Sequence, residues 1–120
     1  MRTNIKYTNL DSTPAMEEYV MMKIGSLDKF IGSMHGAEAL EAYVEIARTS
    51  KHHQKGDVFR AECNLELPGK LLRAEYEDWD ARRAVDEVRK IMEMEIRKYK
   101  EIVRAQDSGG AKEARELRGK

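Results

Sequence analysis

The strongest constraint on the fold of this chain is an alternating run at residues 58–67 that ends in a turn signal. Its inward set is Phe59, Ala61, Cys63, Leu65 and Leu67, and its outward set is Val58, Arg60, Glu62, Asn64 and Glu66. A period of two residues is typical of a strand with one buried face. Pro68–Gly69 predicts a turn, and the alternating segment 71–77 predicts an antiparallel partner that buries Leu72, Ala74 and Tyr76.

Two further segments alternate in the same way. Thr3, Ile5 and Tyr7 share one face of residues 2–8, and Ala42, Val44 and Ile46 share one face of residues 41–49. We therefore expect four strands, each with one apolar face.

In two segments, apolar residues recur with the three- and four-residue spacing of amphipathic helices. The first runs from about Pro14 to Phe30, with Thr13 or Ser12 as N-cap and Pro14 in the first turn. The second runs over residues 81–104, with Asp80 as N-cap. Its apolar stripe consists of Ala81, Ala84, Val85, Val88, Met92, Ile96, Tyr99, Ile102 and Val103.

The predicted order is β-α-β-β-β-α, which indicates an α+β fold. We expect a four-stranded mixed sheet with two helices packed on one face and solvent on the other. The first two strands should be parallel, since a helix connects them, and strands two to four should form an antiparallel meander. Residues 1–104 are predicted to form one domain, and residues 105–120 a flexible polar tail.

Composition narrows the class of protein. The chain has 120 residues and no net charge, with 22 Lys+Arg and 22 Asp+Glu. No apolar run is long enough for a membrane helix, and the N-terminus lacks the pattern of a signal peptide. The single Cys63 cannot form an internal disulfide, which fits a reducing compartment, so we expect a cytoplasmic protein that does not bind membranes.

The second helix carries many cations, and the first helix adds Lys23 and Lys29. Those of the second helix are Arg82, Arg83, Arg89, Lys90, Arg97, Lys98, Lys100 and Arg104, and the loop before the third strand adds Lys51 and Lys55. Such a row could contact successive phosphates. It could equally be a solvated face of ion pairs, with Asp86–Lys90, Glu93–Arg97, Arg82–Asp86 and Arg83–Glu87 as expected pairs.

Metal and catalytic sites are not expected. His35, His52, His53 and Cys63 lack zinc-ligand spacing, and the histidines are read as part of a solvated loop. No phosphate-cradling glycine loop or nucleophile-elbow motif is present. The acidic group Glu75, Glu77, Asp78 and Asp80 is interpreted as capping the second helix. We therefore predict that the protein is not an enzyme and uses no cofactor.

Two stretches of the sequence, and the residues that follow them, resemble a known protein family. Residues 51–62 (KHHQKGDVFRAE) and 65–75 (LELPGKLLRAE) resemble the ribosome hibernation-promoting factor / ribosome-associated inhibitor family. Asp80, Ala84-Val85-Asp86 and Arg97-Lys98-Tyr99-Lys100 continue the resemblance into the second helix, so that it covers residues 2–104. Residues 91–95 are less basic than is usual in that family.

The resemblance implies the same β-α-β-β-β-α fold and a non-enzymatic function. It implies binding to rRNA of the small ribosomal subunit in the channel for mRNA and the A- and P-site tRNAs, which stops translation by steric exclusion during stress or stationary phase. The rRNA-binding residues that it favours on the basic helix face are Lys23, Lys29, Arg82, Arg89, Lys90, Arg97, Lys98 and Lys100.

The resemblance is to the short type of this family, because residues 105–120 are too few for a second, dimerising domain. The protein is expected to be a monomer off the ribosome. Two alternatives remain open from the residues: a general double-stranded-RNA-binding module, and a protein-interaction module that uses Tyr43 with the off-stripe methionines Met21, Met22 and Met94.

Overall fold

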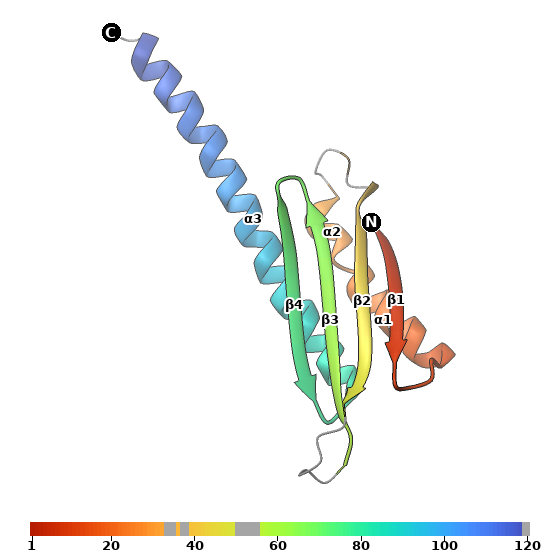
Figure 1. Ribbon diagram of the computed structural model, residues 1–120. Coiled ribbons are helices and arrows are strands. Elements are labelled where there is room, and N and C mark those ends of the chain that lie inside the picture. The colour runs from red at the N-terminus through yellow and green to blue at the C-terminus, as the bar shows by residue number, and fades with distance from the viewer. Residues whose placement is uncertain (33–35, 37–38, 50–55, 119–120) are drawn as a thin grey trace.

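A computed structural model describes residues 1–32, 36, 39–49 and 56–118 of the chain. The elements are β1 (Arg2–Thr8), α1 (Pro14–Gly25), α2 (Asp28–Ile31), β2 (Glu41–Thr49), β3 (Val58–Leu67), β4 (Lys70–Asp78) and α3 (Ala81–Arg118). The helices lie behind one face of a single sheet, and α3 continues past the end of the sheet (Figure 1). The predicted α+β fold is confirmed.

The sheet has the order β1-β2-β3-β4. β1 and β2 are parallel, with Ile5 opposite Val44, while β2–β3 and β3–β4 are antiparallel, with Val44 opposite Cys63 and Cys63 opposite Ala74. Because these partners stand in register, the apolar sets of all four strands share one face. The predicted mixed topology is confirmed.

The turn between β3 and β4 consists of Pro68 and Gly69. Gly69 has a φ of 77°, which a residue without Cβ adopts without strain. The Tyr99 hydroxyl of α3 donates a 2.8 Å hydrogen bond to the Pro68 carbonyl. The turn is therefore tied to the helix that covers the hairpin.

Both predicted N-caps are present. The Thr13 hydroxyl accepts a hydrogen bond from the Met16 amide at 3.1 Å, and Asp80 Oδ1 accepts one from the Arg82 amide at 2.9 Å. Each cap satisfies an amide that has no partner inside its helix. Asp78 in turn accepts from the Asp80 amide, which supports the capping role of this acidic segment.

The prediction of one helix from Pro14 to Phe30 is wrong, because the chain breaks it into α1 and α2. The Leu27 amide donates to the Ile24 carbonyl at 3.0 Å, and the Phe30 amide donates to the Leu27 carbonyl at 2.9 Å. These three-residue spacings tighten the turn relative to an α-helix. The turn lets both Leu27 and Ile31 reach the core, where each is fully buried.

The core lies between the sheet and the helices. α3 contributes Ala84, Val85, Val88, Met92 and Ile96, which are all buried against β3 and β4. The last predicted members of its stripe, Ile102 and Val103, are exposed instead. α3 has passed the end of the sheet at that point, so the stripe extends further than the surface that it can cover (Figure 1).

α3 continues to Arg118, beyond the predicted end near residue 104. Once a helix exists, each added residue gains one hydrogen bond without a new nucleation step. The predicted end near residue 104 rested on Ser108-Gly109-Gly110 and on the shortage of apolar residues after Val103. The division into a domain of residues 1–104 and a flexible tail of 105–120 stays a prediction.

None of the helices among the described residues has the length and apolar character that a membrane span requires.

Candidate nucleic-acid interface

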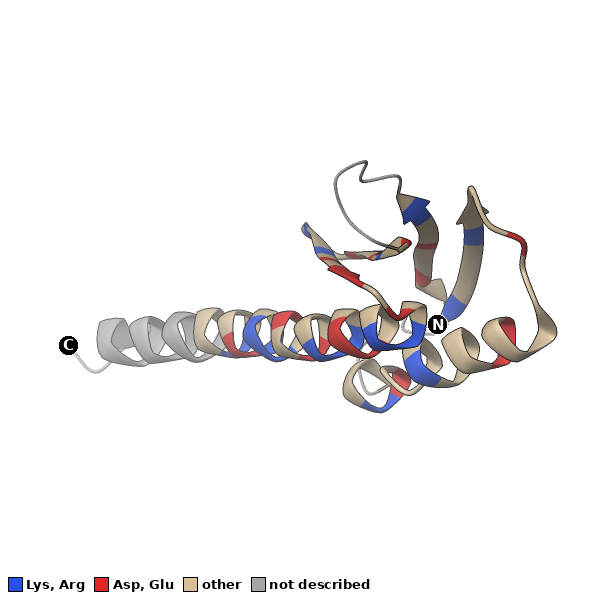
Figure 2. Ribbon diagram, turned by 90° about the horizontal axis from the view of Figure 1, so that it is seen from below, with Lys and Arg blue, Asp and Glu red and all other residues tan. Residues whose placement is uncertain are grey.

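A groove of about 470 Å³ separates α1 from α3 on the helical face of the molecule. α1 and α3 lie side by side there, and basic residues recur along α3 (Figure 2). The groove is lined by Met22, Lys23, Ser26, Lys29, Arg83, Asp86, Glu87, Arg89 and Lys90. Five of these residues are cations and two are anions, so the groove is suited to an anionic ligand.

A hydrogen-bonded bridge closes the floor of this groove. The Tyr19 hydroxyl of α1 donates to Asp86 Oδ1 of α3 at 2.5 Å, and Lys23 Nζ lies 3.6 Å from the same oxygen. The hydrogen bond to Asp86 is the main cause that raises the pKa of Tyr19 to about 12. This bridge holds the two helices in a fixed relation.

The predicted ion pairs within α3 are correct in one case of four. Glu93 and Arg97 pair at 3.2 Å as expected. Lys90 pairs with Glu87 instead of Asp86, and Arg83 pairs with Asp78 of β4 instead of Glu87. The reason is that Asp86 faces α1, where it binds Tyr19 and Lys23. Arg82 likewise lies over the Tyr19 ring, at 5.2 Å from its centroid.

The predicted rRNA-binding residues differ in the exposure of their charged groups and in the partners that these groups contact. Lys90, Arg97 and Lys98 each have a carboxylate within 4 Å, yet their side chains remain 67%, 61% and 66% exposed. Lys29 is exposed beside the Phe30 ring, and Lys100 donates to the Phe30 carbonyl at 2.8 Å. Exposed ion pairs of this kind are worth at most about 1 kcal/mol, so Lys90, Arg97 and Lys98 can exchange partners.

Arg89 has a different environment from the other predicted residues. Its side chain is only 18% exposed, with Nη1 at 2.6 Å from Glu93 and Nε donating to the Ser26 hydroxyl at 2.9 Å. It fastens α3 to the end of α1 as well as lining the groove. Its role in binding RNA stays a prediction.

A second basic pocket lies further along α3. It has a volume of about 330 Å³ and is lined by Phe30, Arg97, Lys100, Glu101 and Arg104. The guanidinium groups of Arg89 and Arg97 lie 5.7 and 5.2 Å from the centroid of the Phe30 ring. Phe30 thus orients cations of α3 from the neighbouring helix α2.

Arg83 and Arg104 line these two pockets although they are absent from the eight favoured residues. A signal in the sequence could have identified them, because Arg83, Lys90, Arg97 and Arg104 are spaced by seven residues. Seven residues make almost two helical turns, so such residues form one row that drifts by about 20° per step.

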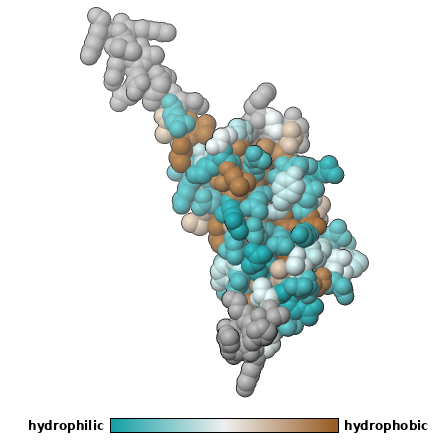
Figure 3. Space-filling view, viewed as in Figure 1, coloured by the Kyte–Doolittle hydropathy of each residue, from teal (hydrophilic) through white to brown (hydrophobic). Residues whose placement is uncertain are grey.

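The opposite face of the molecule is the open face of the sheet, which is mainly hydrophilic (Figure 3). Arg60 pairs there with Glu45 at 2.8 Å and with Glu62 at 2.7 Å, and Arg73 pairs with Glu62 at 3.2 Å. The Arg60 and Asn64 side chains both bind Glu62, and these contacts lower the pKa of its carboxyl. This network joins charged side chains of β2, β3 and β4.

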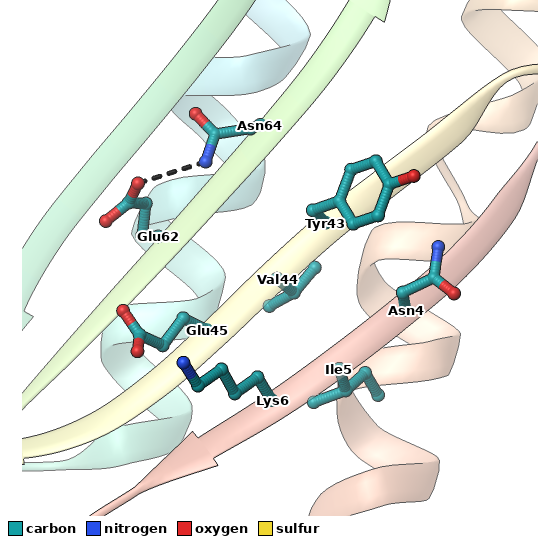
Figure 4. A pocket seen from close by; sticks show the side chains of 8 residues that line it. All are labelled: Asn4, Ile5, Lys6, Tyr43, Val44, Glu45, Glu62 and Asn64. Carbon is teal, nitrogen blue, oxygen red and sulfur yellow. Dashed lines mark hydrogen bonds between the residues drawn. The ribbon is translucent and has the colours of Figure 1, made fainter.

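A shallow hollow of about 300 Å³ lies on this sheet face (Figure 4). Tyr43 is exposed beside it, as the protein-interaction alternative requires, but Met21, Met22 and Met94 lie on helices of the other face. The residues named for that alternative therefore do not form one patch. The lining residues of the hollow are Asn4, Ile5, Lys6, Tyr43, Val44, Glu45, Glu62 and Asn64.

Of the four residues considered for a metal, only Cys63 is described. It is buried, and burial raises the pKa of its thiol to about 12, as expected for a structural cysteine. His35, His52 and His53 lie outside the described residues, as do Lys51 and Lys55. The described part of the chain contains no group of three His, Cys, Asp or Glu side chains suited to a metal ion.

Comparison with known proteins identifies a family for nearly the whole domain. A family model described as sigma 54 modulation protein / S30EA ribosomal protein matches residues 3–104. The chain is 34% identical over 102 residues to a ribosome hibernation promotion factor of Lactococcus lactis, covering 83% of this chain and 50% of that protein. A protein of the same name from Deinococcus radiodurans is 27% identical over 92 residues, covering 77% and 45%. The chain thus spans about half the length of the curated relatives that it matches.

Solved structures show the same fold. The N-terminal domain of Protein Y from Thermus thermophilus has a TM-score of 0.66 and 30% identity, and the match covers 82% of this chain and 99% of that domain. A ribosomal subunit interface protein from Coxiella burnetii has a TM-score of 0.65 and 20% identity, covering 83% and 98%, and supports the fold alone.

Proposed function

Because this chain belongs to the sigma 54 modulation protein / S30EA ribosomal protein family, we propose that it is a ribosome hibernation factor. It binds rRNA of the small subunit in the channel for mRNA and the A- and P-site tRNAs, in the cytoplasm, as a monomer. It acts by steric exclusion, without catalysis and without a cofactor. The relatives named as ribosome hibernation promotion factors support the role.

The observation that carries this proposal is the basic groove between α1 and α3. Its cations come from α1, α2 and α3, and Tyr19, Asp86 and Arg89 hold α1 and α3 together, so an RNA backbone meets charges that are already in place. Phosphate contacts orient a protein on RNA and supply salt-dependent affinity. Lys23, Lys29, Arg82, Arg89, Lys90, Arg97, Lys98 and Lys100 are the proposed contact residues.

The distribution of charge favours the helical face over the sheet face for this contact. Six carboxylates alternate outward on the sheet with four cations, which gives that face an acidic excess. The carboxylates are Glu41, Glu45, Glu62, Glu66, Glu75 and Glu77, and the cations are Arg2, Lys6, Arg60 and Arg73. Phosphates are repelled by such a face, so the helical face should be the one that meets rRNA.

Charge reversal on the helical face tests the proposal. The variant Lys90→Glu/Arg97→Glu should bind small subunits at least tenfold more weakly at about 100 mM salt, and its salt slope should fall by about two, one per lost phosphate contact. Cosedimentation with small subunits over a series of salt concentrations measures both quantities.

The matched control is Arg2→Glu/Lys6→Glu, which makes the same change in net charge at two exposed residues of the sheet face. It should retain wild-type affinity. Failure of the wild-type protein to cosediment at low salt would refute the proposal. Competition experiments distinguish the proposed function from the alternative. If the protein occupies the channel, tRNA and mRNA bound there should displace it. A general double-stranded-RNA-binding module would instead bind free duplex RNA as tightly as small subunits.

A further inference from the structure

One carboxylate lies in the middle of the basic face. Glu93 is on α3 between the groove that ends at Lys90 and the second pocket that begins at Arg97. Its two oxygens have separate partners: Oε1 is 2.6 Å from Arg89 Nη1, and Oε2 is 3.2 Å from Arg97 Nη2. Glu93 therefore links the two pockets by holding a cation of each.

The surroundings of Glu93 match those that a phosphate group would require. The hydrogen bond from Arg89, followed by the charges of Arg97 and Lys29, lowers the pKa of Glu93, so that this carboxyl is ionised at neutral pH. Lys29, Arg89 and Arg97 also approach the Phe30 ring to within 5.3, 5.7 and 5.2 Å. Three cations thus converge on one anion and one aromatic ring.

Arg89 and Arg97 differ in how easily each can leave the Glu93 carboxylate. Arg89 is mostly buried and has a second fixed contact at the Ser26 hydroxyl. Arg97 is largely exposed, and it contacts the Glu93 carboxylate and the Phe30 ring. The Arg97 side chain can therefore turn away from Glu93 and bind a phosphate of the RNA backbone, while Arg89 stays beside Glu93.

We propose that Glu93 is an internal competitor of the RNA backbone: it occupies Arg97 when the protein is free and limits affinity when RNA binds. This inference rests on the proposed function of the same face. Binding requires Arg97 to exchange the Glu93 carboxylate for a phosphate, and the carboxylate then repels the bound backbone. Glu93 thus weakens the protein's hold on the ribosome.

The test is the isosteric variant Glu93→Gln, which removes the charge and keeps the shape. It should bind small subunits roughly three- to fivefold more tightly at about 100 mM salt, the range for freeing an exposed ion pair. The salt slope should become steeper by up to about one, because Arg97 gains a full phosphate contact. Glu66→Gln is the matched control, since it makes the same change in net charge on an exposed residue of the sheet face.

A double-mutant cycle with Arg97→Gln identifies the partner. If Glu93 acts through Arg97, the gain from Glu93→Gln should shrink in the Arg97→Gln background. Unchanged or weaker binding of Glu93→Gln, with its fold verified by urea denaturation, would instead mean that Glu93 only positions the arginines, and would overturn the inference. An equal gain in Glu66→Gln would overturn it too. Failure of the proposed function has a different signature, because the wild-type protein would then not bind subunits at any salt concentration.

Discussion

At the scale of single residues, polar contacts between side chains far apart in the sequence join α1 to α3. Tyr19, Lys23 and Ser26 of the N-terminal region meet Asp86 and Arg89 of α3 through hydrogen bonds and one ion pair. Partners 67 and 63 residues apart in the chain create both the groove and its fixed width. The charges that line the groove are therefore ordered before any ligand arrives.

Removal of the Tyr19 hydroxyl should weaken this bridge. Tyr19→Phe leaves the Asp86 carboxylate without its hydrogen bond, at a cost of about 1 kcal/mol, less than a fully buried charged hydrogen bond because the site is partly exposed. Urea denaturation at neutral pH measures this loss. A free energy of unfolding equal to that of the wild type would mean that water replaces the hydroxyl without cost.

The same residue predicts how stability depends on alkaline pH. The pKa of Tyr19 is raised from 10.0 to about 12 in the folded protein, so folding favours the protonated phenol. This contribution is fully present below pH 10 and is lost as the pH rises towards 12. Cys63, raised from 9.0 to about 12, acts in the same direction from pH 9 upward. Tyr19→Phe should therefore show a shallower loss of stability between pH 10 and 12 than the wild type.

At the scale of elements, α3 has two parts with different surroundings. Up to Tyr99 its apolar stripe is buried against β3 and β4, whereas residues 101–106 are exposed. The apolar spacing continues past this boundary to Ile102 and Val103. The length of the strands, and not the composition of the helix, decides where the stripe stops contributing to the core.

Two matched substitutions should reveal this boundary. Ile96→Ala removes a side chain that is 0% exposed and should cost about 2–5 kcal/mol by cavity formation. Ile102→Ala removes the same atoms from a residue that is 50% exposed and should cost less than about 0.5 kcal/mol. Urea denaturation of both variants measures the difference. Similar losses would indicate that Ile102 has a partner in the folded protein.

At the scale of the whole molecule, opposite faces carry opposite excess charge although the chain as a whole is neutral. The sheet holds its acidic excess in a network around Arg60, and the helices place their cations along a groove and a second pocket. Net charge therefore conceals the feature on which the proposed function depends.

Truncation after Arg104 tests the predicted division of the chain. The shortened protein should keep its free energy of unfolding within about 0.5 kcal/mol, because the last described side chains, residues 101–106, are exposed. Its far-UV circular dichroism should show less helix, since α3 runs to Arg118 in the full chain. A loss above about 1.5 kcal/mol would place residues 105–120 in the folding unit.

Much of the fold follows from the sequence because its signals are local. The period-two pattern predicts β1 to β3 with their observed bounds and β4 to within one residue at each end. The Thr13 and Asp80 caps depend on neighbouring amides, so sequence reasoning finds them too. The row of cations on α3 is equally visible, and its seven-residue spacing would have added Arg83 and Arg104 to the favoured rRNA-binding residues.

The tertiary structure alone decided what depends on residues distant in the chain. The break between α1 and α2 arises because Leu27 and Ile31 both reach the core, and the partner of Asp86 is set by α1 and not by α3. Arg89 is held by Ser26, and Phe30 gathers three cations from two helices. Hydrophobic period and capping act over a few residues, whereas ion pairs and buried contacts form wherever packing brings side chains together. The sequence therefore determined the strands, the N-caps and the row of cations on α3, and only packing decided which charges are free to bind.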